Sequence, residues 1–97
     1  MVTKLSIIIP AYNEGPTIHN ILNQVAAISL SPGVKKEIIL VNDCSKDDTE
    51  AQILQFKGEN PHLDIRYLTH ETNQGKGAAL HTGIKEASGE YLIIQDA

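Results

Sequence analysis

The 97-residue chain alternates short aliphatic runs with longer amphipathic segments, and this alternation restricts its fold more than any other feature. The first run, residues 5–9, is rich in β-branched side chains, which is typical of a strand buried on both faces. Beyond it, apolar side chains recur every three or four residues, which predicts a helix. The same alternation continues along the chain. The predicted strands are residues 5–9, 37–41, 64–69 and 90–95.

Strands that alternate with helices form a parallel sheet, because right-handed crossovers return each strand in the same direction. We therefore predict an α/β fold, a Rossmann-like three-layer sandwich with strand order 3-2-1-4. Pro16 is expected at or near the first position of the first helix. Ser45 is expected to cap the second helix, and Asn73 to cap a third helix over residues 78–87.

Three acidic side chains follow the predicted strands at their carboxyl ends: Glu14, Asp43 and Asp96. With this strand order a ligand lies where the order reverses, so we expect the three carboxylates to converge on one crevice. Such a cluster suits Mg²⁺ or Mn²⁺, which prefer hard oxygen ligands. It also suits a nucleoside. At Asp43 the base would be uracil or guanine, because adenine has no ring N–H to donate.

Two glycine-containing loops differ from the common phosphate-binding motifs. The loop at residues 10–15 has one glycine and an acid, whereas a dinucleotide-binding turn reads G-x-G-x-x-G. The segment Gly75-Lys76-Gly77 lacks the Ser or Thr that follows the lysine of a P-loop. It is either a flexible entry to the third helix or a loop whose amides, with Lys76, lie near a phosphate.

The charge balance and the cysteine count exclude several functions. Eight Lys and Arg against twelve Asp and Glu give a net charge of −4 without a basic cluster, so nucleic-acid binding is not expected. Cys44 is the single cysteine and is interpreted as inert. No segment has the roughly 18 apolar residues of a membrane-spanning helix, so we expect a cytoplasmic protein, with association at the cytosolic membrane face left open. The histidines lack metal-ligand spacing and are assigned surface or helix-face positions: His19, His62, His70 and His81.

Four segments carry a family pattern. Residues 6–14 read SIIIPAYNE, and residues 37–49 read EIILVNDCSKDDT. Residues 73–79 read NQGKGAA, and residues 89–97 read GEYLIIQDA. In this order they resemble the motifs of family 2 glycosyltransferases, the last one being the approach to the metal-binding DxD motif. The resemblance extends over nearly the whole chain and implies a GT-A fold.

By this resemblance, residues after the first strand line a nucleotide pocket, and residues at the end of the second strand surround the base and ribose. Asp96 matches the first acid of the DxD motif, which implies Mg²⁺ or Mn²⁺ at Asp96. The general base is expected beyond residue 97, so no catalytic residue is assigned within the chain. The implied nucleotide-binding residues are Pro10, Ala11, Tyr12, Glu14, Val41, Asp43, Lys76, Asp96 and Ala97.

The resemblance also implies a function. We expect inverting, metal-dependent sugar transfer from a UDP- or GDP-sugar to a polysaccharide, lipid or polyprenyl phosphate, as in cell-envelope polysaccharide synthesis or the dolichyl-phosphate sugar synthases. Residues 1–97 are expected to be the N-terminal nucleotide-binding part of a longer catalytic domain, cut inside the DxD motif and inactive alone. The alternatives are a nucleotide-binding fragment without transferase activity and a structural α/β domain. A free edge on the fourth strand is expected to favour homo-oligomers.

Overall fold

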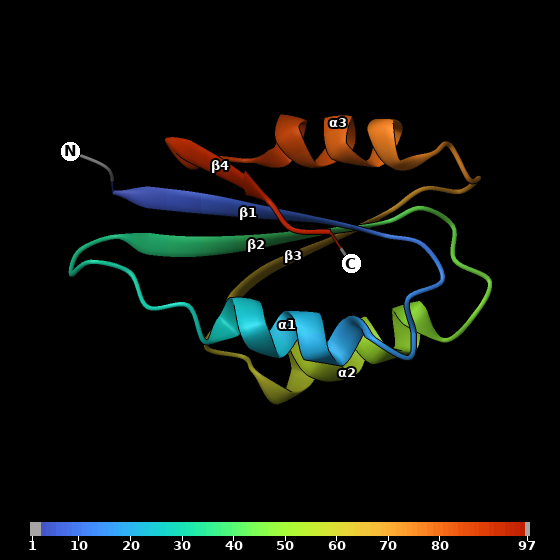
Figure 1. The fold of residues 1–97 in the computed structure, drawn as a ribbon, viewed down its shortest axis with the longest axis horizontal. Helices are drawn as coiled ribbons and strands as arrows, with labels where there is room; N and C mark the ends of the chain where they lie inside the picture. The colour runs from blue at the N-terminus through green and yellow to red at the C-terminus, as the bar shows by residue number, and fades with distance from the viewer. Residues whose placement is uncertain (1–2, 97) are drawn as a thin grey trace.

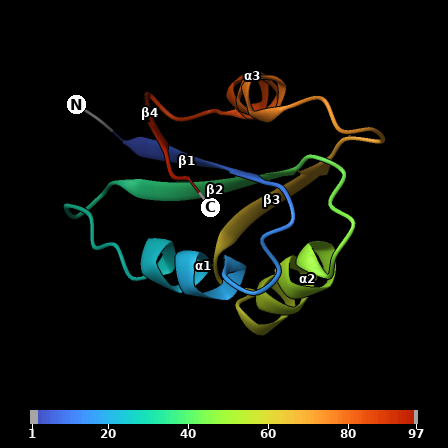
Figure 2. The ribbon, with the colours of Figure 1, turned by 45° about the vertical axis from the view of Figure 1, so that its right-hand side comes forward.

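The protein is a four-stranded parallel sheet between two helical layers, seen in a computed structural model that describes residues 3–96 (Figure 1). The strand order is β3-β2-β1-β4, which confirms the predicted order. Helices α1 and α2 cover one face of the sheet and α3 covers the other (Figure 2), which confirms the three-layer prediction. The elements are β1 (Lys4–Ala11), α1 (Ile18–Ala26), β2 (Lys35–Asn42), α2 (Thr49–Glu59), β3 (Asp64–Thr69), α3 (Lys76–Glu86) and β4 (Tyr91–Ile94).

Side chains of the central strands alternate between two apolar clusters, one on each face of the sheet. Ile7 and Ile9 of β1 belong to the cluster that includes residues of α1 and α2. Ile8, between them, belongs to the cluster on the α3 side, together with Ala79. Helix α3 packs closely against the sheet at Gly83. A Cβ added to this residue would lie only 2.5 Å from Cγ2 of Ile8. Burial on both faces explains why these strands are almost continuously apolar.

A buried carboxylate, Glu37, ties together the amino-terminal ends of β1 and β2 and the connection between α3 and β4. It accepts hydrogen bonds from Ser6 Oγ (2.7 Å) and Ser88 N (3.0 Å). Lys4 Nζ lies 3.5 Å and Arg66 Nε 3.4 Å from its Oε1. Burial alone would raise the pKa of Glu37, but the Ser88 and Ser6 hydrogen bonds and the Lys4 charge outweigh it, and the pKa lies below its ordinary value.

The first two helices begin later than the sequence predicts. Helix α1 begins at Ile18, so Pro16 lies in the turn before it. Helix α2 has Asp48 at its N-cap position, so the prediction of a Ser45 cap is wrong. The Ser45 hydroxyl instead donates to Asn42 Oδ1 at 2.6 Å, and this bond fixes the turn that leaves β2.

The third helix begins earlier than predicted. It starts at Lys76, and Gly75 precedes it with a φ of 95°, a left-handed conformation that favours glycine. The predicted cap, Asn73, does not cap the helix. Its amide Nδ2 donates to the main-chain carbonyl of Asp43 at 3.3 Å, so Asn73 joins the loop before α3 to the loop after β2.

Strand β4 forms one edge of the sheet, and all four of its side chains are exposed. The exposed fractions run from 43% at Leu92 to 61% at Tyr91. Pairing of this apolar edge with a second copy of the chain stays a prediction. Across residues 3–96, none of the helices has the length and apolar character needed to cross a membrane.

Candidate functional site

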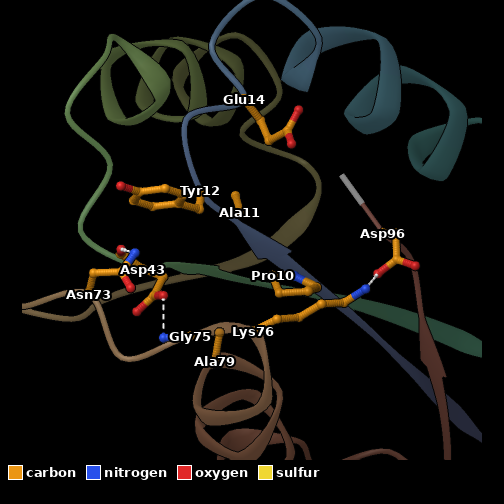
Figure 3. A pocket seen from close by; sticks show the side chains of 10 residues that line it. All are labelled: Pro10, Ala11, Tyr12, Glu14, Asp43, Asn73, Gly75, Lys76, Ala79 and Asp96. Carbon is orange, nitrogen blue, oxygen red and sulfur yellow. Dashed lines mark hydrogen bonds and ion pairs between the residues drawn. The ribbon is translucent and has the colours of Figure 1, made fainter.

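A pocket of about 340 Å³ opens at the carboxyl ends of the strands, beside the point where the strand order reverses between β1 and β4 (Figure 3). Its walls come from the end of β1, the loops after β1 and β2, the start of α3 and the segment after β4. This is the position that the predicted strand order requires. The lining residues are Pro10, Ala11, Tyr12, Glu14, Asp43, Asn73, Gly75, Lys76, Ala79 and Asp96.

The loop after β1 is held in place by the start of α2. The Glu14 amide donates to Thr49 Oγ1 at 2.9 Å, and the Gly15 amide donates to Asp47 Oδ2 at 3.0 Å. These bonds fix the main chain next to Tyr12. Tyr12 is 42% exposed and its ring lies along the pocket (Figure 3), so a ligand can reach it.

Asp43 is the buried acid of the pocket, and its side chain is only 4% exposed. Its Oδ1 accepts hydrogen bonds from His70 Nδ1 (2.8 Å) and the Gln74 amide (2.9 Å), and its Oδ2 accepts one from the Gly75 amide (2.8 Å). Burial alone would raise the pKa of Asp43. The bonds from Gln74, His70 and Gly75 outweigh burial and hold the pKa below its ordinary value, so the group is a carboxylate at neutral pH.

His70 is buried beside Asp43, so the prediction of a surface or helix-face position is wrong. Its side chain is 8% exposed, and its Nε2 lies 2.8 Å from Thr82 Oγ1 on α3. The register pairs Asn42, the last residue of β2, with Thr69, the last residue of β3. The residues that follow them, Asp43 and His70, therefore meet at the carboxyl ends of these strands. Metal-ligand spacing could not reveal this pair, but the positions of both residues directly after adjacent strands could have.

Lys76 and Asp96 form an ion pair across one side of the pocket (Figure 3). Both side chains are more than half exposed, so the pair is expected to stabilise the fold by little, about 0–1 kcal/mol. Lys76 is the first residue of α3, where unpaired main-chain N–H groups add partial positive charge. This side of the pocket therefore presents the cationic groups.

The three predicted carboxylates all line the pocket, but they do not form one ligand cluster. Glu14 accepts a hydrogen bond from Thr17 Oγ1 at 2.7 Å, Asp43 is held by protein donors, and Asp96 pairs with Lys76. Within residues 3–96, no three His, Cys, Asp or Glu side chains are grouped so that they could hold a metal ion. The expectation of a three-carboxylate cation site is therefore wrong, because each acid has its own partner.

Of the predicted nucleotide-binding residues that the structure describes, Val41 is the one that does not line the pocket. Val41 is fully buried and packs with Ile8 and Ile39 on the α3 side of the sheet, so its side chain belongs to the core and not to the pocket wall. Ala97 lies outside the described residues. The other seven lie around the pocket.

The chain is similar to known enzymes in sequence and in fold. Poly-beta-1,6-N-acetyl-D-glucosamine synthase from Staphylococcus epidermidis is 38% identical over 96 residues, which are 99% of this chain and 22% of that protein. The mannosyltransferase PcManGT from Pyrobaculum calidifontis, in complex with GDP-Man and Mn²⁺, matches with a TM-score of 0.87 and 26% identity, covering 98% of this chain and 27% of that one. S. aureus TarS 1-349, in complex with UDP-GlcNAc, matches with a TM-score of 0.79 and 31% identity over 96% of this chain and 26% of that one.

The fold is that of a GT-A glycosyltransferase. Residues 6–97 match the family Glycosyl transferase family 2, and the chain belongs to that family. The predicted resemblance is therefore confirmed. The chain spans about a fifth of the length of the curated relatives that it matches.

Proposed function

We propose that this chain binds the nucleoside diphosphate of a sugar nucleotide and supplies the donor side of an inverting glycosyltransferase. One observation supports this most: the pocket at the switch point of the sheet is lined by seven of the nine residues that the family motifs suggest. Similar solved proteins hold GDP-Man or UDP-GlcNAc. This pocket would bind the same class of ligand, a sugar nucleotide.

The base would lie between Tyr12 and Asp43. A carboxylate only accepts hydrogen bonds, so Asp43 is suited to a ring N–H, which uracil and guanine have and adenine lacks. The exposed Tyr12 ring offers an apolar face for stacking and a hydroxyl at its edge. The proposed donor is therefore a UDP- or GDP-sugar.

The diphosphate would lie toward Lys76 and the start of α3, where the ammonium and the helix N-terminus favour anions. Asp96 is the residue that would hold a divalent ion, since its exposed carboxylate is a hard oxygen ligand that fits Mg²⁺ or Mn²⁺. When bound, such an ion neutralises the diphosphate and stabilises the departing nucleoside diphosphate. Because the Lys76–Asp96 pair is exposed, Lys76 is free to turn from the carboxylate to a phosphate.

The acceptor would attack the anomeric carbon from the face opposite the diphosphate, which inverts the configuration. We propose a polysaccharide, lipid or polyprenyl-phosphate acceptor, with the protein at the cytosolic face of the membrane. A phosphate acceptor is already anionic and needs little help from a general base. Because the chain spans 22% of its relative, we expect the 97 residues alone to bind nucleotide without transferring sugar.

Isothermal titration of the chain with UDP, GDP and ADP, each with and without Mn²⁺, tests the proposal. We expect UDP or GDP to bind more tightly than ADP, and to bind more tightly with Mn²⁺ than without it. A matched control, Asp48→Asn, changes an acid outside the pocket and should bind like the wild type. Equal affinity for ADP would contradict the role of Asp43, and no binding under any condition would contradict the nucleotide pocket.

A further inference from the structure

His70 joins three parts of the protein through two short hydrogen bonds. It follows β3, its Nδ1 lies 2.8 Å from Asp43 Oδ1 after β2, and its Nε2 lies 2.8 Å from Thr82 Oγ1 on α3. The ring is nearly inaccessible and is not among the residues that line the pocket. It therefore lies behind Asp43 and contacts a ligand only through that residue.

The partners of the ring determine where its proton lies. An ionised carboxylate can only accept, so His70 Nδ1 must carry the hydrogen that it shares with Asp43. In the neutral ring Nε2 is then an acceptor, and the Thr82 hydroxyl donates to it. The two bonds fix the ring at both ends and allow it a single orientation.

Protein donors occupy most of the acceptor sites of the Asp43 carboxylate. A carboxylate has about four lone-pair sites, two on each oxygen. Oδ1 accepts from His70 and from the Gln74 amide, which uses both of its sites. Oδ2 accepts from the Gly75 amide, which leaves one site. The side chain thus offers a ligand one hydrogen-bond acceptor site, on Oδ2.

We propose that His70 is a positioning residue for nucleobase selection, because it holds the Asp43 carboxylate so that one acceptor site on Oδ2 faces the ligand. This inference rests on the proposed function of the pocket. One acceptor site matches one ring N–H, as in uracil or guanine. Without the His70 anchor the carboxylate can rotate about its χ angles, and the Gln74 and Gly75 amides lose a fixed partner.

Three variants separate positioning from packing. His70→Leu removes both hydrogen bonds and replaces the ring with an apolar side chain of similar bulk. His70→Asn keeps a donor that can reach Asp43, because the asparagine amide nitrogen occupies nearly the position of Nδ1. Thr82→Val removes only the hydroxyl that fixes the far end of the ring. The exposed neighbour His81, changed to Asn, is the matched control on α3.

Nucleotide titrations of the 97-residue chain test the proposal, with far-UV circular dichroism to verify that each variant is folded. We expect His70→Leu to weaken binding of the preferred nucleotide, UDP or GDP, by about tenfold while changing ADP binding less, so that the selectivity ratio falls. His70→Asn should restore most of this ratio, Thr82→Val should lie between, and His81→Asn should match the wild type. In ¹⁵N spectra of the free wild-type chain, His70 should carry its proton on Nδ1.

Two results would overturn the role of His70. One is a folded His70→Leu or Thr82→Val variant with the wild-type selectivity ratio, and the other is a ring that carries its proton only on Nε2. A wild-type chain that binds none of the three nucleotides would instead overturn the proposed function, and the role of His70 in base selection with it.

Discussion

Replacing Glu37 with glutamine tests how the sheet is anchored at the end opposite the pocket. The substitution keeps the shape of the side chain and removes its charge. Glu37 accepts hydrogen bonds from Ser6 and Ser88, and Ser6 Oγ in turn accepts one from the Gly89 amide at 2.8 Å. The Ser6 hydrogen must therefore point at Oε2 of Glu37. A glutamine keeps this bond, as a neutral one, only with its oxygen in that position, and its Nε2 donor then faces Lys4 and Arg66.

The expected loss of stability follows from these bonds. Hydrogen bonds to a charged group contribute about 1.5–3 kcal/mol each and neutral ones about 0.5–1.5 kcal/mol. In Glu37→Gln the three bonds from Ser6 Oγ, Ser88 N and Ser88 Oγ change from the charged class to the neutral class. The free energy of unfolding should therefore fall by about 2–4 kcal/mol near neutral pH. For a domain of this size that corresponds to a decrease in Tm of roughly 10–30 °C.

Urea unfolding followed by circular dichroism at several pH values measures this loss. The folded-state pKa of Glu37 lies below the ordinary 4.5, so its contribution is complete above 4.5 and is lost as the pH falls through the folded-state pKa. Glutamine does not titrate, so the difference between wild type and Glu37→Gln should shrink as the pH is lowered. Glu86→Gln, which removes only an exposed pair with Arg66, should cost about 0–1 kcal/mol. Equal stability of Glu37→Gln and wild type near neutral pH, or a difference independent of pH, would refute the reasoning.

Three further predictions concern the packing, the pocket and a strained turn. Gly83→Ala should destabilise the fold by about 1–3 kcal/mol, because the added Cβ would meet Ile8. Gly58→Ala, in α2 with open space around it, should instead stabilise the fold by about 0.5–1 kcal/mol. Thermal unfolding of the two variants measures both changes. Asp96→Asn should abolish the Mn²⁺-dependent part of nucleotide affinity and leave the metal-independent part, and titration showing an unchanged Mn²⁺ effect would contradict this. Cys44→Gly should raise the free energy of unfolding, measured by urea titration, by up to about 1 kcal/mol, because the φ of 60° at this position suits glycine. A decrease would contradict this and show that the Cys44 side chain stabilises the fold by more than the backbone strain costs.

The sequence was sufficient to predict the sheet and the place of the pocket because both depend on local patterns. The aliphatic runs specify strands, their alternation with helices specifies parallel pairing, and the strand order then fixes which loops meet. Glu14, Asp43 and Asp96 therefore line one pocket, as their positions after strands predict. Whether three acids share one ion depends on their individual partners, and those come from residues such as Thr17 and Lys76 that strand patterns do not select.

The errors concern side chains whose surroundings depend on the tertiary structure. Ser45 is a residue type that commonly caps helices, but its hydroxyl donates to Asn42 Oδ1 and accepts from the Asn13 amide before the helix begins. The spacing of the histidines predicts a surface or helix-face position for His70, but its partner, Asp43, is 27 residues away and is adjacent only through the β2–β3 register. The family resemblance implies that Val41 lines the nucleotide pocket, but strand alternation turns its side chain into the α3-side core.

Chemical-shift mapping of the ¹⁵N-labelled chain with UDP or GDP and Mg²⁺ tests the nucleotide pocket most directly. The account predicts saturable shifts of the main-chain amides of Ala11, Tyr12, Gly75 and Lys76 around the pocket. The amides of Gln55 and other residues on the outer surface of α2 should not move. The same shifts produced by ADP at equal concentration, shifts confined to α2, or no shifts at any concentration would contradict it.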